Sequence, residues 1–343
     1  MRYIGSKTAS LGILERTVMR HAAPTWNQFC DPFAGVCTVA RHFKKLGFRT
    51  VTGDLLYQSF VFQRAMLEHN SQPRFPGLRC VWRTDTSVPP HEAVLRYLNG
   101  LSGTDSYLTH NYSLAGKMRR KFFTERNARR IDKIRIQIAE WASACLVSER
   151  EEAYLIASLL NAADAVANTA GTYYAYLKVF YRKAKQPVQL LPLPIHGNGK
   201  RNSAHLADAV SLTKRTATDV LYLDPPYNER DYGAYYHLTE TIARWDCPEP
   251  NGKSGIPMEG RPKSSFCSSG TAESEFKRLL SAPEAKLILV HYSVHGLVPH
   301  STVMECLTAL GPTSFHTWQV RKYSTSRGEK GSSGHRLYVC KPH

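Results

Sequence analysis

The stretch DVLYLDPPYNERDY, residues 219–232, decides the fold. Its apolar part, residues 220–223, predicts a short buried strand. Because proline has no N–H to donate to a sheet, Pro225 and Pro226 end that strand at Asp224. In open α/β sheets, ligands bind at the carboxyl ends of the strands. The stretch therefore predicts a carboxylate on a rigid loop at the ligand-binding edge of a sheet.

Composition favours a globular protein with a polyanionic partner. The chain has 343 residues, of which 42% are hydrophobic, so it can bury a substantial core as one large domain or two moderate ones. Lys and Arg outnumber Asp and Glu by 45 to 28, a formal net charge of +17, which makes nucleic acid the leading candidate partner.

Membrane, secretory and metal-binding classes are disfavoured. No segment approaches the roughly 18 apolar residues of a membrane-spanning helix, and the start, MRYIGSK, lacks the apolar segment of a signal peptide. The eight cysteines show no CxxC or zinc spacing. We therefore expect a cytoplasmic protein with reduced thiols, no metal site and no membrane association.

A glycine-bearing turn precedes the central stretch. Residues 29–40, FCDPFAGVCTVA, predict a brief strand, a turn and a helix. Residues 49–52 predict a second strand, which ends at Gly53 and Asp54. An acidic residue about 20 positions beyond such a turn holds ribose hydroxyls in Rossmann-like units. The alternative is an ordinary α/β turn followed by an N-capping Asp.

Basic residues concentrate between the two motifs. A helix is expected from about Thr124, with cations at i, i+3, i+4 and i+7 beside an isoleucine-rich face. Such a basic stripe suits phosphate contact, although a charge run can also be a solvated helix face. The candidate DNA-binding residues are Lys117, Arg119, Arg120, Arg126, Arg129, Arg130 and Lys133.

The remaining elements complete an α/β pattern. Ser148 and Glu151 form a capping box that begins a long core helix. Residues 235–245 predict a helix, and residues 247–270 are rich in Pro, Gly and Ser and predict a long loop. A strand is expected at 286–290, and the strands at 314–320 and 335–340 suit an antiparallel edge hairpin.

Several motifs together resemble the N6-adenine-specific DNA methyltransferases of restriction-modification systems, in their alpha arrangement. The resemblance covers most of the chain, and the order of the motifs supports it as much as their residues do. The motifs are RYIGSK at 2–7, DPFAG at 31–35, FTERN at 123–127, NTAG at 168–171, Asp-Pro-Pro-Tyr at 224–227 and YHLTET at 236–241.

The resemblance implies a Rossmann-like S-adenosylmethionine-dependent methyltransferase fold. Its mixed sheet would have seven strands, six parallel and one antiparallel. It implies a catalytic domain at 1–70 and 150–343, a mainly helical DNA-recognition insert at 71–149 and a further DNA-facing loop at 247–270. The implied cofactor-binding residues are Tyr3, Gly5, Lys7, Asp31, Pro32, Phe33, Ala34, Gly35, Asp54 and Asp224.

The implied reaction is methyl transfer to the N6 amine of an adenine flipped out of duplex DNA. The Asp224 carboxylate and the Pro225 carbonyl would accept hydrogen bonds from the amine, Pro226 would stiffen the loop, and Tyr227 would stack on the base. The implied biology is protection of DNA in a prokaryotic or phage-encoded restriction-modification system, with a cognate restriction endonuclease as partner.

Three alternatives stay open or are disfavoured. The same tetrapeptide suits an RNA adenine or DNA cytosine-N4 methyltransferase, because it needs only a planar conjugated amine. Cys37, where the family usually has glycine, and Asn202, in a segment where it has an acidic residue, suit a catalytically silent DNA-binding relative. A nicotinamide-dependent enzyme is disfavoured because a full GxGxxG is missing.

Overall fold

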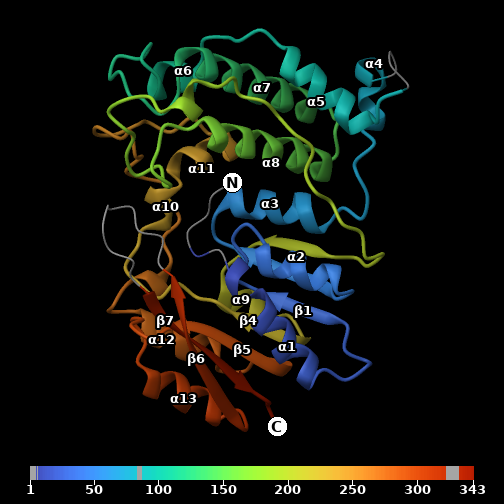
Figure 1. Cartoon of the computed structure of the whole chain (residues 1–343), viewed down its shortest axis with the longest axis vertical. Helices are drawn as coiled ribbons and strands as arrows, with labels where there is room; N and C mark the ends of the chain where they lie inside the picture. The colour runs from blue at the N-terminus through green and yellow to red at the C-terminus, as the bar shows by residue number, and fades with distance from the viewer. Residues whose placement is uncertain (1–4, 6, 83–86, 322–331) are drawn as a thin grey trace. The chain divides into compact units, whose positions relative to one another are not determined.

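The structure, a computed structural model, describes residues 5, 7–82, 87–321 and 332–343. It divides into two compact units (Figure 1). A helical unit contains Leu56–His196 and Tyr232–Arg261, and a sheet unit contains Gly5–Leu55, Gly197–Asp231 and Pro262–His343. None of the helices in the described ranges combines the length and apolarity needed to cross a membrane.

The sheet unit is built on one mixed sheet with the strand order β3-β2-β1-β4-β5-β7-β6. β7 runs antiparallel to both of its neighbours, and the other pairs are parallel. The predicted sheet of seven strands with one reversed strand is confirmed. The strands are β1 (Gln28–Asp31), β2 (Arg49–Asp54), β3 (Ser203–Leu206), β4 (Thr218–Leu223), β5 (Ala285–Ser293), β6 (Thr313–Arg321) and β7 (Ser332–Cys340).

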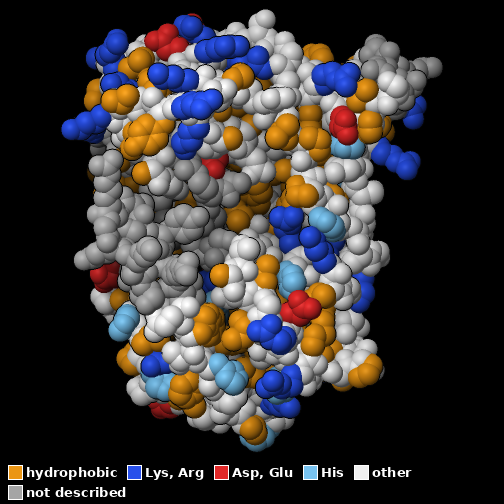
Figure 2. Space-filling model, viewed as in Figure 1, with side chains coloured by type: hydrophobic (Ala, Val, Ile, Leu, Met, Phe, Trp, Pro, Cys, Tyr) orange, Lys and Arg blue, Asp and Glu red, His pale blue; other side chains and the backbone are white. Residues whose placement is uncertain are grey.

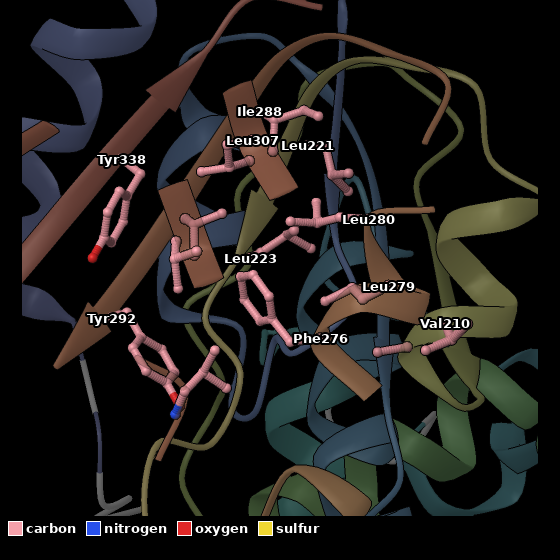
Figure 3. Packing of buried hydrophobic residues seen from close by; sticks show 14 of the residues in the cluster. Val210, Leu221, Leu223, Phe276, Leu279, Leu280, Ile288, Tyr292, Leu307 and Tyr338 are labelled. Carbon is pink, nitrogen blue, oxygen red and sulfur yellow. The ribbon is translucent and has the colours of Figure 1, made fainter. Parts of the chain in front are cut away.

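β4 lies at the centre of the sheet, and all of its residues are buried. Its side chains alternate between two apolar clusters, because successive residues of a strand point to opposite faces. Val220 and Tyr222 pack with α1 (Leu11–His21) and α2 (Thr38–Lys45). Leu221 and Leu223 pack with α9 (Ala209–Lys214), α12 (Ala272–Leu279) and α13 (His300–Thr308), as Figure 3 shows in part. Helices on both faces explain why the strand has no polar side.

The helical unit contains two helices whose starts the sequence predicts. Thr124 accepts a hydrogen bond from the Asn127 N–H as the N-cap of α7 (Glu125–Ser143). α8 (Glu149–Val166) begins with the complete Ser148–Glu151 capping box. The other helices of the unit are α3 (Tyr57–Leu67), α4 (Arg79–Trp82), α5 (Pro90–Gly100), α6 (Tyr107–Tyr112), α10 (Tyr232–Tyr235) and α11 (His237–Arg244).

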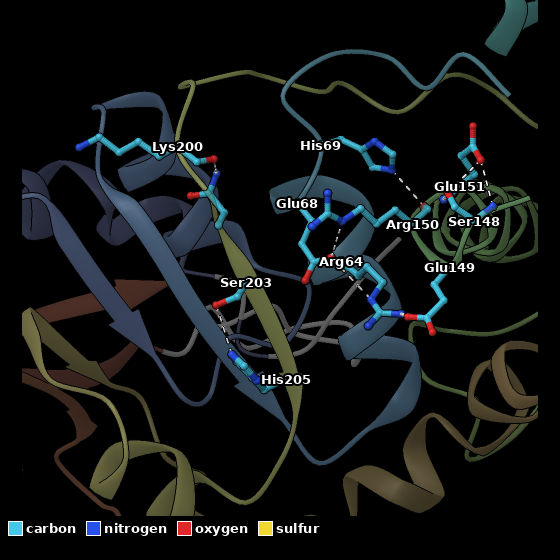
Figure 4. A network of polar contacts seen from close by, with 11 residues as sticks. Arg64, Glu68, His69, Ser148, Glu149, Arg150, Glu151, Lys200, Ser203 and His205 are labelled. Atoms are coloured by element: carbon cyan, nitrogen blue, oxygen red, sulfur yellow. Dashed lines mark hydrogen bonds and ion pairs between the residues drawn. The ribbon is translucent and has the colours of Figure 1, made fainter. Parts of the chain in front are cut away.

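The helical unit is larger than the insert predicted at 71–149. α3 and α8 pack against each other and α11 packs against both. As a consequence, α8 is buried on most of its circumference. Ion pairs add to this contact, with Arg64 on Glu149 at 2.7 Å and Arg150 on Glu68 at 3.2 Å (Figure 4). The part of the predicted loop up to Arg261 belongs to this unit. The role of these segments in DNA recognition stays a prediction.

Candidate active site and nucleic-acid interface

Asp224 follows β4 at the carboxyl edge of the sheet, as the sequence predicts, and an ion pair with Lys7 holds it there. Lys7 Nζ lies 2.7 Å from Asp224 Oδ2, and the two side chains are only 9% and 15% exposed. The same ammonium group donates to the Gly5 carbonyl at 3.3 Å. Sequence reasoning assigned Lys7 to the cofactor alone, whereas its described polar contacts are to Asp224 and Gly5.

A second carboxyl group, Asp31, lies at the end of the neighbouring strand β1. Burial raises the pKa of Asp31 well above its ordinary value, and the charge of Asp224 raises it further. Burial also raises the pKa of Asp224, but the Lys7 ammonium opposes this shift. Both carboxyl groups therefore have raised pKa values, and Asp224 is the one that an ion pair with an ammonium group shifts back toward its ionised form.

The ring of Tyr227 is framed by other aromatic side chains. Tyr292 and His335 meet it edge-on, each with a centroid distance of 6.1 Å. The Lys7 ammonium lies 5.8 Å from the ring centroid, a distance at which a cation–π attraction operates. Tyr227 is half-buried, so its ring has a defined orientation and part of its surface available for a ligand.

The glycine turn between β1 and α2 is tied to the end of β2. The Gly35 N–H donates to Asp54 Oδ2 at 3.0 Å, and the Ala34 N–H donates to the Gly53 carbonyl at 3.1 Å. Phe33 packs edge-on against Phe266. A carboxylate offers about four acceptor positions, so Asp54 can hold this turn and also accept from a ligand diol.

Cys37 ends that turn in the left-handed conformation, with φ 54°, at the N-cap of α2. Its side chain is fully buried, and burial raises its pKa to about 12. The residue is therefore an unreactive thiol in the core. Pro32 lies in the same turn, and Tyr3, the remaining predicted cofactor residue, lies outside the described residues.

The predicted basic residues separate into exposed and structural groups. Lys117, Arg119 and Arg126 are exposed, and Figure 2 shows Lys and Arg side chains gathered over the helical unit near α6 and α7. Arg129 is half-buried and pairs with Asp105. Arg130 donates to a backbone carbonyl, that of Asn99, and Lys133, on α7, is half-buried.

Arg120 does not fit the predicted role in phosphate contact. It is only 3% exposed, and its guanidinium donates to the carbonyls of Asn111, Gly252 and Lys253 at 2.9–3.2 Å. Arg120 therefore fixes residues 252–253 of the long loop to the end of α6. A spacing pattern identifies a helix face, but it cannot show that a distant loop covers the first residues before the helix.

Residues 174–185 form an exposed surface that sequence reasoning missed. Tyr174, Val179 and Tyr181 are 55%, 70% and 56% exposed, and the cations Lys178 and Arg182 among them are also exposed. Alternating aromatic and basic residues are typical of nucleic-acid-binding segments. The signal is present in the sequence, YAYLKVFYRKAK, as this interleaving.

Two buried asparagines hold this surface in place. Asn168 donates to the carbonyls of Lys121 and Leu177, both at 3.0 Å, and accepts from the Tyr181 N–H at 3.1 Å. Asn127 donates to the Ala184 carbonyl at 3.2 Å. The backbone of residues 174–185 is therefore fixed, while Tyr174, Lys178, Tyr181 and Arg182 are exposed to solvent.

Comparisons with known proteins agree with the motifs. The family model of D12 class N6 adenine-specific DNA methyltransferases matches residues 3–296. The chain is 34% identical to the type II methyltransferase M.FokI of Planomicrobium okeanokoites over 98% of its own length, but it spans only 51% of that relative.

Two shorter relatives match along most of both chains. The chain is 32% identical to the type II methyltransferase M.NlaIII of Neisseria lactamica, over 96% of this chain and 94% of that one. It is 30% identical to M.CviAII of Paramecium bursaria Chlorella virus 1, over 90% and 88%. The chain belongs to the D12 class N6 adenine-specific DNA methyltransferase family.

Proposed function

We propose that this chain transfers a methyl group from S-adenosylmethionine to the N6 amine of an adenine in duplex DNA. The observation that carries the proposal is the Asp224 carboxylate, held by Lys7 at the carboxyl end of the central strand and followed by two prolines and a half-buried Tyr227. Membership of the D12 class family supports adenine as the target base.

The Asp-Pro-Pro-Tyr loop answers a specific chemical need. The exocyclic amine of adenine is a poor nucleophile because its lone pair is delocalised into the ring. Hydrogen bonds from the amine to the Asp224 carboxylate and the Pro225 carbonyl localise that lone pair and aim it. The nitrogen would then be placed to take a methyl group from the bound donor, and the proton that the amine loses would pass to bulk water. Lys7 favours the ionised form of Asp224, which is the form that accepts these hydrogen bonds.

The residues of the glycine turn suit an adenosine-bearing methyl donor. When bound, S-adenosylmethionine supplies a methyl group on a positively charged sulfur. Asp54 at the end of β2 would accept from the ribose hydroxyls, and residues 33–35 would line the cofactor. The nearby carboxyl groups of Asp31 and Asp224 suit a ligand that carries positive charge.

DNA would be held by the exposed cations of the helical unit. We assign phosphate contacts to Lys117, Arg119 and Arg126 and to the surface of residues 174–185. Tyr227 would stack on the flipped adenine. Protection of DNA against a cognate restriction endonuclease, in the cytoplasm of a prokaryotic or phage-infected cell, is the biological role that we infer from this activity.

Mass spectrometry of nucleosides tests the activity. Duplex DNA of mixed sequence is incubated with the protein and S-adenosylmethionine that carries a deuterated methyl group, and is then digested. Labelled N6-methyl-2′-deoxyadenosine is the expected product. Labelled N4-methylcytosine, or label only in a parallel RNA reaction, would redirect the substrate assignment. Cofactor binding without transfer to either polymer would identify a silent relative.

The salt dependence of binding tests the assigned DNA surface. The double variant Lys178→Gln/Arg182→Gln should weaken binding to all sequences and lower the slope of log K against log salt by about 2, because each lost phosphate contact removes about 0.9. A matched double variant on the sheet unit, Arg20→Gln/Lys341→Gln, removes two exposed cations and should leave the slope unchanged. Equal slopes in both variants would reject the assignment.

A further inference from the structure

A row of three buried polar side chains crosses adjacent strands beside the Asp-Pro-Pro-Tyr loop. Tyr222 on β4, His291 on β5 and His335 on β7 are 1%, 0% and 7% exposed. Tyr222 Oη lies 3.2 Å from His291 Nδ1, and His291 Nε2 lies 3.1 Å from His335 Nδ1. This row of side chains therefore links β4, which Asp224 follows, to the antiparallel strand β7.

The imidazoles of His291 and His335 are both held in the neutral form. Burial and then the nearby Lys7 ammonium lower the pKa of both, that of His335 to about 4. A neutral imidazole has one N–H donor and one acceptor nitrogen. The two hydrogen bonds can therefore form only with a matching tautomer on each ring, which fixes the rotation of both rings.

The His335 end of this row of polar side chains contacts Tyr227. The ring of His335 contacts the Tyr227 ring at a centroid distance of 6.1 Å and an angle of 86°. Trp318 lies against His291 at 5.1 Å and against His335 at 6.2 Å. His335 therefore contacts His291 through a hydrogen bond, Trp318 through its indole and Tyr227 through an edge-on ring contact, so its position determines one of the ring contacts that surround Tyr227.

We propose that His335 is a positioning residue for Tyr227, and that His291 and Tyr222 fix the His335 ring through their hydrogen bonds. Three polar groups in a core cost free energy of desolvation that an apolar trio would not, and one of them, His335, contacts Tyr227 of the loop that would receive the base. The inference rests on the proposed function, because it assigns Tyr227 to the stacking of a flipped adenine.

The expected effect is a loss in the use of DNA with little change in cofactor binding. In His335→Ala, the Tyr227 ring loses its edge contact, and kcat/KM for DNA should fall about 10-fold to 100-fold, as small misplacements of an aligned group do. His335→Asn can still contact His291 Nε2 through its side-chain amide and should recover part of the loss. Tyr222→Phe removes only the first hydrogen bond and should show a smaller loss of the same kind.

A double-mutant cycle tests the proposal. Methyl transfer and the fluorescence of 2-aminopurine at the target position are measured for His335→Ala, Tyr227→Ala and the double variant, with thermal unfolding midpoints as a check on folding. If His335 acts through Tyr227, its replacement has no further effect in the Tyr227→Ala background. A control, His300→Ala, removes a histidine that contacts Tyr338 instead and should leave both signals unchanged.

The outcomes separate this inference from the proposed function. Losses that multiply in the double variant would overturn the role of His335, as would a His335→Asn variant that folds normally but recovers nothing. A wild-type protein that transfers no methyl group would instead overturn the proposed function. The fluorescence arm of the cycle needs no transfer, so it still tests whether His335 and Tyr227 act together on a bound base.

Discussion

Each end of β4 has an aspartate paired with a lysine, but the pKa of the aspartate is shifted in opposite directions at the two ends. At the amino end, Asp219 pairs with Lys286 at 2.6 Å, and at the carboxyl end, Asp224 pairs with Lys7 at 2.7 Å. Burial raises the pKa of both carboxyl groups, but for Asp219 the contacts outweigh it, so that its pKa is lowered. The pKa of Asp224 stays raised.

The hydrogen bond from Lys286 is the largest of the effects that lower the pKa of Asp219, and two backbone donors, which have no counterpart at Asp224 in the part of the chain that the structure describes, add to it. Asp219 Oδ2 also accepts from the N–H groups of Asn27 and Gln28, at 2.8 and 2.9 Å, which join the start of β1 to β4. Within the described residues, the hydrogen-bonding partner of the Asp224 carboxylate is Lys7. A carboxylate satisfied by the backbone stabilises the fold, whereas one balanced by a single side chain keeps acceptor capacity for a substrate.

The largest expected effect is on methyl transfer in Asp224→Ala. Losing one of the two acceptors of the amine should lower kcat by at least about 10²–10³-fold, while cofactor binding, measured by calorimetry, stays within a few-fold. The matched variant Asp219→Ala removes the other carboxylate of the strand and, below its unfolding temperature, should retain activity. Equal activity losses in the two variants would erase the distinction between the ends of β4.

The next effect concerns the acid limb of the pH–rate profile in Lys7→Met. Asp224 accepts only when it is ionised, so activity falls as pH drops through its pKa. Lys7 lowers that pKa against the effect of burial, so its removal should move the acid limb to higher pH and lower kcat at neutral pH by about tenfold. Lys7→Arg keeps the charge and should leave the limb nearly in place, and Lys286→Met should not move it.

Local sequence signals predicted the parts of this comparison that depend on neighbouring residues. Pro225 and Pro226 placed Asp224 at a strand end, and the capping box at Ser148 placed the start of α8. The hairpin of β6 and β7 also followed from two apolar runs with a polar connection. In the first two cases, the determining residues are a few positions apart, and in the third the two strands follow each other directly in the sequence.

Contacts between distant segments could not be predicted in this way. The partner of Lys7 depends on how the amino-terminal segment approaches the end of β4, which spacing does not encode. β3 was missed because its residues Ser203–Leu206 are few and only one of them, Ala204, is buried. Arg120 was assigned to DNA because the loop that covers it, near Gly252, is far away in the sequence.

A smaller effect, on stability, is expected at the amino end in Asp219→Ala. Two backbone N–H groups and Lys286 lose their acceptor, which should lower the free energy of unfolding by about 1–3 kcal/mol. Because the folded pKa of Asp219 is below its unfolded value, this contribution is present above the unfolded pKa, near 3.9, and is lost as pH falls. Denaturant unfolding at pH 7 and pH 3 should therefore show a difference from wild type that shrinks at the lower pH.

The smallest effect is expected for Lys286→Met, and it decides which contact of Asp219 matters most. The Lys286 side chain is 59% exposed, so solvent screens the pair, and its removal should cost at most about 1 kcal/mol of stability. If the backbone donors set the low pKa of Asp219, Lys286→Met should unfold at nearly the wild-type denaturant concentration and keep most of the pH dependence. A loss as large as that of Asp219→Ala would mean that the lysine pairs dominate at both ends of β4, and that the backbone N–H groups are not what separates a structural from a reactive carboxylate.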